Sequence, residues 1–156
     1  MKVAQAVRDG LMASLVALGL LIACGLLDVA RSGRVPEAWS VAAMFRDWPI
    51  YLIMVVFYLV VNSLIGIAYA AGFEKIVKDS GPAWGMLFSL PHIVFTGYLV
   101  GYLPFLGFWP ANADPGPGLL FMNMFFTGPF VLVFAHWAYG ITMGMLYDPI
   151  AEPRIG

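Results

Sequence analysis

The chain is poor in charge and in cysteine, and each shortage excludes a class of protein. Only 11% of its 156 residues are charged, whereas about 25% of a soluble domain is charged. The single cysteine, Cys24, rules out an internal disulfide and a cysteine-based metal cluster. The net charge is -1 at pH 7. Because no basic patch is available to neutralise phosphates, nucleic acid is excluded as a partner.

Sequence signatures of soluble enzymes are absent as well. The chain has no Ser-His-Asp set, no phosphate-binding loop and no pair of carboxylates in a plausible cleft. Four aspartates, Asp28, Asp47, Asp79 and Asp148, fall at the ends of apolar segments, where solvated boundary charges are expected. We therefore predict that the protein is not an enzyme and has neither a catalytic residue nor a metal site.

Apolar residues make up 62% of the chain, and its mean hydropathy is +0.86. Four segments, 11–30, 50–73, 83–108 and 119–147, are each long enough to cross a bilayer, since about 20 apolar residues span a core of about 30 Å. We predict an all-α fold, a single domain over residues 1–156 with four transmembrane helices in the bacterial inner membrane. Lys and Arg are more numerous in the termini and second loop than in the first and third loops, which favours cytoplasmic termini.

The first segment carries two further signals. Its small residues favour close contact with other helices: Ala13, Ala17, Gly19, Ala23 and Gly25. Residues 21–24, Leu-Ile-Ala-Cys, also resemble a bacterial lipoprotein signal, after which Cys24 would be lipidated. Apolar residues continue beyond Cys24, which favours a transmembrane helix, and the sequence leaves lipidation of Cys24 open.

Glycines mark the expected contacts between helices. The third segment contains a G-x-x-x-G pair, and the last segment reads H-x-x-Y-G-x-x-x-G-x-x-Y from His136 to Tyr147. Helices with small residues on one face pack that face against other helices. We expect this packing at Gly66, Gly97, Gly101, Gly140 and Gly144.

A weak internal repeat relates the two halves of the chain. An offset of 78 residues aligns Tyr58 with His136, Asn62 with Gly140, Gly66 with Gly144 and Tyr69 with Tyr147. The repeat suggests two helical hairpins in the same orientation, related by an axis along the membrane normal.

The same residues carry a family resemblance. The last segment, with His136, Tyr139-Gly140, Gly144 and Tyr147, resembles the closing helix of a family of short, four-helix bacterial inner-membrane proteins of uncharacterised function. The third segment adds Gly81, Trp84-Gly85, Pro104 and Phe108, and the second segment has Tyr58 where the family pattern suggests histidine. The resemblance implies a four-span bundle in the inner membrane and supplies no activity.

Polar residues gather at one depth in the predicted bundle. His92 lies ten residues past Pro82, and His136 lies eleven before Tyr147. At about 1.5 Å per residue, both histidines sit roughly 15–17 Å deep, near the bilayer centre, as does Asn62. Polar groups at this depth need partners. We predict a buried polar network of Tyr58, Asn62, Ser89, His92, Thr96, His136 and Tyr139.

Three interpretations of this polar centre remain open. We predict the first, in which the network only holds the bundle together, without a cofactor, and the protein is a non-catalytic structural, accessory or assembly subunit. Its partners would then be other membrane subunits or copies of itself. In the second, His92 and His136 are the axial ligands of a haem b, or the centre binds a quinone. In the third, the centre transports a solute or relays protons.

Overall fold

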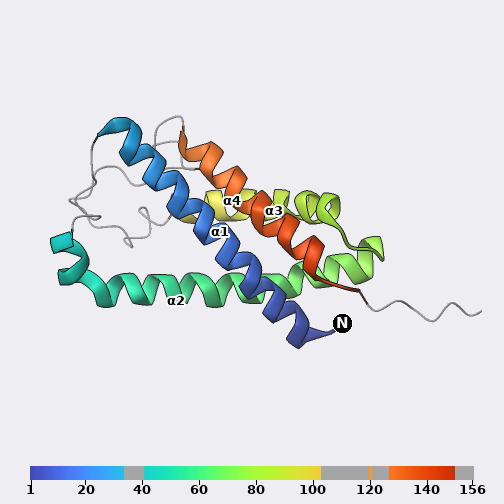
Figure 1. Cartoon of the computed structure of the whole chain (residues 1–156). Helices are drawn as coiled ribbons and strands as arrows, with labels where there is room; N and C mark the ends of the chain where they lie inside the picture. The colour runs from blue at the N-terminus through green and yellow to red at the C-terminus, as the bar shows by residue number, and fades with distance from the viewer. Residues whose placement is uncertain (34–40, 103–119, 121–126, 150–156) are drawn as a thin grey trace, which may run out of the picture.

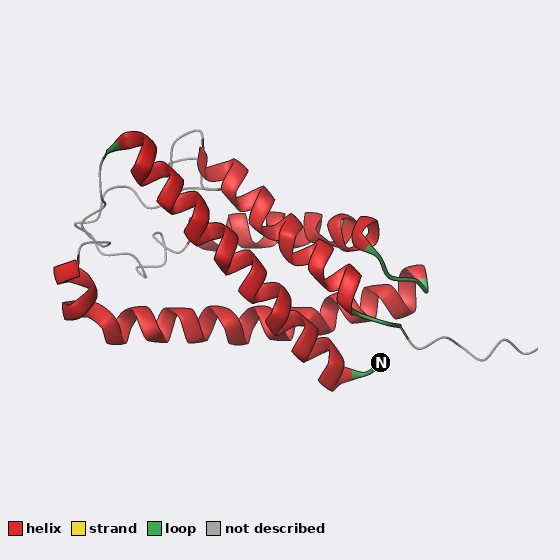
Figure 2. Ribbon diagram, viewed as in Figure 1, coloured by secondary structure: helices red, strands yellow, loops and turns green. Residues whose placement is uncertain are grey.

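The computed structural model describes residues 1–33, 41–102, 120 and 127–149, and these residues form helices and short connections without a strand (Figures 1 and 2). The helical elements are α1 (Val3–Ser32), α2 (Val41–Gly72), the π-helix η2 (Phe73–Val77), α3 (Pro82–Tyr102) and α4 (Thr127–Leu146). The predicted all-α class is confirmed. Three described helices are long and apolar enough to cross a membrane: Val3–Ser32, Phe45–Val77 and Gly128–Leu146.

The ends of the first two helices differ from the prediction. α1 begins at Val3 and not at residue 11, because polar residues continue a helix as readily as apolar ones. It ends at Gly33, whose φ of 65° lets its N–H reach the Val29 carbonyl. α2 begins at Val41, so that Pro49 lies inside the helix and not at its start. Such a proline costs one backbone hydrogen bond, which transmembrane helices tolerate.

α2 also extends beyond its predicted end. It continues without a break into η2, which includes residues expected in the second loop. The left-handed Lys78, with a φ of 55°, then ends the helix, and the Asp79 N–H donates to the Phe73 carbonyl at 3.1 Å. The remaining connection to α3 is short, so α2 and α3 run in opposite directions.

The second half of the chain contains α3 and α4. α3 covers the first part of the predicted third segment, and residues 103–108 lie outside the described residues. α3 is not among the three described helices that are long and apolar enough to span. Of the predicted fourth segment, 119 and 121–126 lie outside the described residues, and α4 begins at Thr127.

The first helix pair, α1 and α2, crosses at small residues. A Cβ built on Gly10 would lie 2.8 Å from the Ser63 carbonyl oxygen and 3.1 Å from the Gly66 Cα. A Cβ built on Gly66 would lie 2.5 Å from the Ala6 carbonyl oxygen. The two backbones therefore touch, and no side chain larger than hydrogen fits at this crossing.

The second pair, α3 and α4, crosses in the same way. Gly85 and Gly140 face each other, and Gly144 faces Gly81, so that a Cβ on any of Gly85, Gly140 or Gly144 would overlap the facing backbone. α4 also packs along α1, and the two run side by side in Figure 1. Together with the end of α2 they bury one core, whose members are Ala6, Ala13, Ala17, Tyr69, Ala70, Phe73, Tyr139, Met143 and Tyr147.

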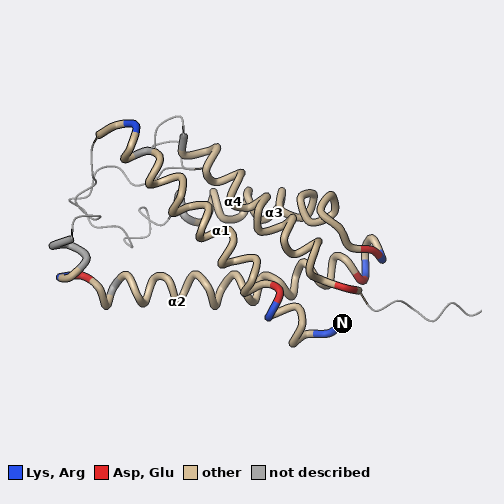
Figure 3. Tube along the Cα trace, in the orientation of Figure 1, with Lys and Arg blue, Asp and Glu red and all other residues tan. Residues whose placement is uncertain are grey.

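Charged residues keep to the ends of this bundle. In Figure 3 the acidic and basic positions lie near the helix termini, and the long middle stretches of the helices carry none. α3 and α4 contain no Asp, Glu, Lys or Arg. An uncharged middle between charged ends is the pattern that a bilayer requires of a membrane protein.

Candidate functional site

The crossing of α3 and α4 brings the two histidines together. One turn beyond the Gly85–Gly140 contact, the Ser89 Cβ lies 3.1 Å from the Cβ position of Gly140. Such close backbones leave little space between the next side chains along each helix, which are His92 and His136. Their ring centroids are 4.4 Å apart, and the planes meet at 78°, edge to face.

Each histidine is held by a different hydrogen bond. His136 Nδ1 lies 2.7 Å from the Leu132 carbonyl oxygen, one turn back in α4. Since a carbonyl can only accept, Nδ1 of His136 carries the proton and its Nε2 keeps a lone pair. His92 is 9% exposed, and its Nδ1 lies 3.3 Å from the Tyr69 hydroxyl of α2.

Two tyrosines complete the centre. Tyr139 of α4 donates from its hydroxyl to the backbone carbonyl of Asn62 in α2, at 2.5 Å. The Tyr139 ring lies edge to face with Tyr69, at a centroid distance of 5.2 Å, and with His92, at 5.4 Å. Such pairs contribute about 0.5–1.5 kcal/mol beyond their buried area. The result is a cluster of four rings, Tyr69, His92, His136 and Tyr139, which we call the ring cluster.

The side chains of two other predicted network members, Asn62 and Ser89, form hydrogen bonds within their own helices and not with the ring cluster. Asn62 donates from its side-chain amide to the Tyr58 carbonyl at 2.9 Å, and the Ser89 hydroxyl donates to the Met86 carbonyl at 2.6 Å. Both bonds stay within one helix. Tyr58 and Thr96 are partly buried. Tyr69 of the ring cluster is not a member of the predicted network, although it lies seven residues from Asn62 on the same helical face.

The predicted packing glycines fall into three groups. Gly66, Gly140 and Gly144 lie at the two backbone crossings. Gly97 faces side chains instead, because Leu120 and Leu132 fill the space beside it. Gly101 belongs to α3, and its surroundings lie outside the described residues.

A haem between the two histidines does not fit this arrangement. Axial ligation requires the macrocycle to lie between the two imidazoles, whereas the rings of His92 and His136 contact each other directly. Two of the predicted packing glycines, Gly97 and Gly140, leave no room for a macrocycle, since Gly140 packs on Gly85 and Gly97 packs on leucines. α3 and α4 would have to separate before these histidines could ligate a haem.

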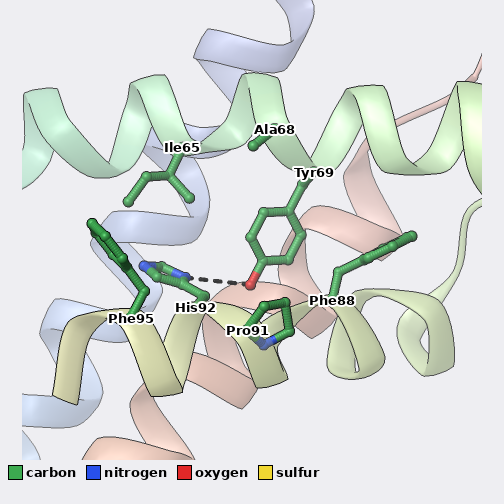
Figure 4. A pocket seen from close by; sticks show the side chains of 7 residues that line it. All are labelled: Ile65, Ala68, Tyr69, Phe88, Pro91, His92 and Phe95. Carbon is green, nitrogen blue, oxygen red and sulfur yellow. Dashed lines mark hydrogen bonds between the residues drawn. The ribbon is translucent and has the colours of Figure 1, made fainter. Parts of the chain in front are cut away.

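A cavity of about 260 Å³ opens on the other side of the ring cluster, between α2 and α3 (Figure 4). Its walls are Ile65, Ala68, Phe88, Pro91 and Phe95, and its polar groups belong to Tyr69 and His92. The rim is open, since Phe95 is 63% exposed, while Tyr69 and His92 are nearly covered. The cavity therefore leads from the apolar outside of the bundle to its polar centre.

Two polar sites lie at the bundle end that holds the N-terminus, and neither was predicted. Tyr147 donates to Glu74 Oε1 at 2.5 Å, and the Met1 amino group lies 2.9 Å from Glu74 Oε2. Burial, aided by the bond to Glu74, raises the pKa of Tyr147 to about 12. Asp9, expected in a polar start, is 1% exposed within α1 and pairs with Arg8.

Comparison with family models, with curated proteins and with solved structures gives no match for this chain. The resemblance to short four-helix inner-membrane proteins therefore stays a prediction. The functional argument depends on the geometry of the crossings, the ring cluster and the cavity.

Proposed function

We propose that the protein is a non-catalytic structural, accessory or assembly subunit of a larger complex in the bacterial inner membrane. In this proposal α3 is the fourth span, because it packs along α4 over most of its length. Both termini lie in the cytoplasm, on the side where Lys and Arg are more numerous. Helix packing, and not chemistry, is its means of action.

One exposed face of α1 supports this role above all. Gly19 and Ala23 are one turn apart and both are exposed, and nothing lies within 4 Å of a Cβ built on Gly19. The flanking side chains are large and apolar, with Ile22 51% exposed and Leu26 57% exposed. The small residues at the two internal crossings hold helices in backbone contact. The Gly19–Ala23 face has the same composition and no helix upon it among the described residues.

This face suits a helix of another membrane protein. Lipid tails are as apolar as leucine, so helices associate in a bilayer mainly where small residues let their backbones approach. A face with Gly19 and Ala23 at its centre and leucine and isoleucine at its edges allows that approach. The proposed partner is therefore a transmembrane helix, supplied by another subunit or by a second copy of the chain.

The test is a substitution that covers the Gly19–Ala23 face and leaves the bundle intact. We expect the wild-type protein to purify in mild detergent as part of a larger assembly, visible on a native gel. Gly19→Leu should release it, because the new side chain fills the approach surface. Val56→Leu is the matched control, since Val56 is 50% exposed on α2 and away from this face. A wild-type protein that migrates alone, or a Gly19→Leu assembly that persists, contradicts the proposal.

The chain's cysteine content allows the partner to be distinguished. Cys24 is its only cysteine, so a Cys24→Ser, Gly19→Cys double variant carries one thiol at the centre of the face. Oxidation in membranes gives a disulfide-linked dimer if the partner is a second copy. A monomer in this assay, together with a larger assembly on the native gel, assigns the face to a different protein.

A further inference from the structure

The cavity between α2 and α3 combines an apolar wall with two hydrogen-bonding groups at its base. Phe88 and Phe95 flank it, and Figure 4 shows Tyr69 and His92 pointing toward each other across its floor. Ligand pockets typically pair mostly apolar walls with a few polar groups that fix orientation. This composition is the one expected of a small-molecule binding site.

The floor presents donors to an incoming molecule. With Nδ1 of His92 accepting from Tyr69, the neutral ring carries its proton on Nε2. Figure 4 shows this second nitrogen turned toward Phe95, and it makes no hydrogen bond within the part of the chain that the structure describes. The Tyr69–His92 bond is long, at 3.3 Å, against about 2.7–2.8 Å for a typical hydroxyl bond. A ligand that offers an acceptor at better geometry can therefore take the Tyr69 hydroxyl bond from His92.

Charge and depth limit what that molecule can be. None of the seven lining residues is charged, so the cavity offers nothing to pair with a phosphate or a carboxylate. His92 lies ten residues into α3, which is roughly 15 Å along the helix axis. Phospholipid head groups stay at the interface, whereas a neutral lipophilic head enters the hydrocarbon core.

We propose that this cavity binds the head group of a lipophilic quinone. A quinone carbonyl accepts from the Tyr69 hydroxyl or from His92 Nε2–H, and its ring lies between Phe88 and Phe95. The volume of about 260 Å³ lies just under the range of about 300–1,000 Å³ for whole ligand pockets. It holds a ring, and the isoprenoid tail leaves past the exposed Ala68 and Phe95 into the lipid. The site is independent of the Gly19–Ala23 face, so either proposal can fail alone.

Binding is tested with decylubiquinone and the full chain in phosphatidylcholine nanodiscs. Quenching of tryptophan fluorescence gives the dissociation constant. Decylbenzene, which has a six-membered ring and the same tail but no carbonyl or methoxy oxygen, is the comparison ligand. It does not quench tryptophan, so its binding is measured by its displacement of decylubiquinone. We expect decylubiquinone to bind at least about tenfold more tightly than decylbenzene, because only the quinone uses the polar floor.

Variants locate the site. Ala68→Phe fills the cavity from α2 and should weaken quinone binding by about tenfold or more. Tyr69→Phe removes one donor and should weaken it about threefold to tenfold. Val56→Phe places the same bulk elsewhere on the exposed face of α2 and should bind like the wild type. Photolabelling by an azido-quinone should mark peptides of α2 or α3.

Several results would overturn the assignment. Equal binding of decylbenzene means that the polar floor plays no part. Wild-type binding by a folded Ala68→Phe variant, or label confined to α1 and α4, means that the quinone binds elsewhere. If Ala68→Phe does not fold, the photolabel decides on the wild-type chain alone.

Discussion

Gly85 of α3 and Gly140 of α4 meet backbone to backbone, and each occupies the space that a Cβ of the other would need. This contact holds the second helix pair at its closest approach. It also sets the spacing of His92, two turns along α3, and His136, one turn along α4, whose ring centroids are 4.4 Å apart. The position of the ring cluster therefore requires glycine at both Gly85 and Gly140.

A single methyl group at this contact should destabilise the bundle. We expect Gly85→Ala to cost about 1–3 kcal/mol, because α3 and α4 must move apart to accommodate it. Gly19→Ala is the matched control, since its Cβ meets open space. Alanine's higher helix propensity should leave that variant unchanged or more stable, by up to about 1 kcal/mol. Unfolding in mixed micelles measures both, and equal effects would refute the packing argument.

Tyr139 ties α4 to α2 by a single hydrogen bond to the Asn62 carbonyl. This bond joins the two helices beside the contact of the Tyr69 and Tyr139 rings. Tyr139→Phe should cost about 0.5–1.5 kcal/mol of unfolding free energy. Tyr98→Phe, on the outer face of α3 where Tyr98 is 47% exposed, should cost little. A Tyr139→Phe variant as stable as Tyr98→Phe would show that the bond contributes nothing.

The contact between the histidine rings predicts an absorption spectrum without haem. We expect the gently solubilised protein, oxidised and then reduced with dithionite, to show no Soret band, because no space for a macrocycle lies between His92 and His136. A Soret band that shifts on reduction and is lost in both His92→Ala and His136→Ala would contradict this. It would mean that α3 and α4 separate to ligate a haem.

The sequence predicts the class of the fold and the depth of the polar residues in the membrane better than it predicts their hydrogen-bond partners. Helical rise alone puts His92 and His136 at one depth, because both lie a similar number of residues from the same end of the bundle. The bonding of Asn62 and Ser89 is not predictable in this way. Each finds an acceptor within its own helix, at Tyr58 and Met86. Whether a side chain bonds within its helix or across depends on how the helices cross.

Burial at the helix ends is equally hidden from the sequence. Hydropathy places Asp9 in a polar start, yet α1 begins at Val3 and places that carboxylate against the bundle. Tyr147 and Glu74 lie 73 residues apart in the chain, and only the packing of α4 beside η2 brings them together. No periodicity in either segment signals such a contact.

Removing Arg8 alone should lower the unfolding free energy more than replacing Arg8 and Asp9 together. Asp9 Oδ1 accepts from Arg8, while its Oδ2 is buried without a hydrogen bond among the described residues. Arg8→Gln removes the compensating charge and should cost about 1–3 kcal/mol. Adding Asp9→Asn should recover part of the loss, because a neutral amide is cheaper to bury.

The ion pair Arg46–Asp47, at the opposite end of the bundle (Figure 3), is the control for this cycle. It has the same spacing, and its arginine is as exposed as Arg8, but the Asp47 side chain is 31% exposed whereas that of Asp9 is 2% exposed. Arg46→Gln should change stability little, since exposed ion pairs contribute little. If the Arg8→Gln, Asp9→Asn double variant is no more stable than Arg8→Gln, the buried charge is not the cause.

Tyr147 should make the protein sensitive to alkaline pH. Its pKa is raised from 10.0 to about 12 by burial first and then by the bond to Glu74. A folded-state pKa above the unfolded one means that the neutral hydroxyl stabilises the fold. That contribution is complete below pH 10 and is lost as the pH rises from 10 toward 12. We expect the unfolding free energy of the wild type to fall more steeply over this interval than that of Tyr147→Phe.

Glu74→Gln separates the two causes of this shift. Glutamine keeps an acceptor oxygen for the Tyr147 hydroxyl but removes the nearby negative charge. Because burial is the larger cause, the unfolding free energy of Glu74→Gln should fall at alkaline pH almost as much as that of the wild type. In Tyr147→Phe the part of this fall that Tyr147 causes should be absent. Tyrosinate absorbance, followed through the same titration, reports the ionisation directly. Identical pH profiles for the wild type and Tyr147→Phe would show that this hydroxyl does not titrate with folding.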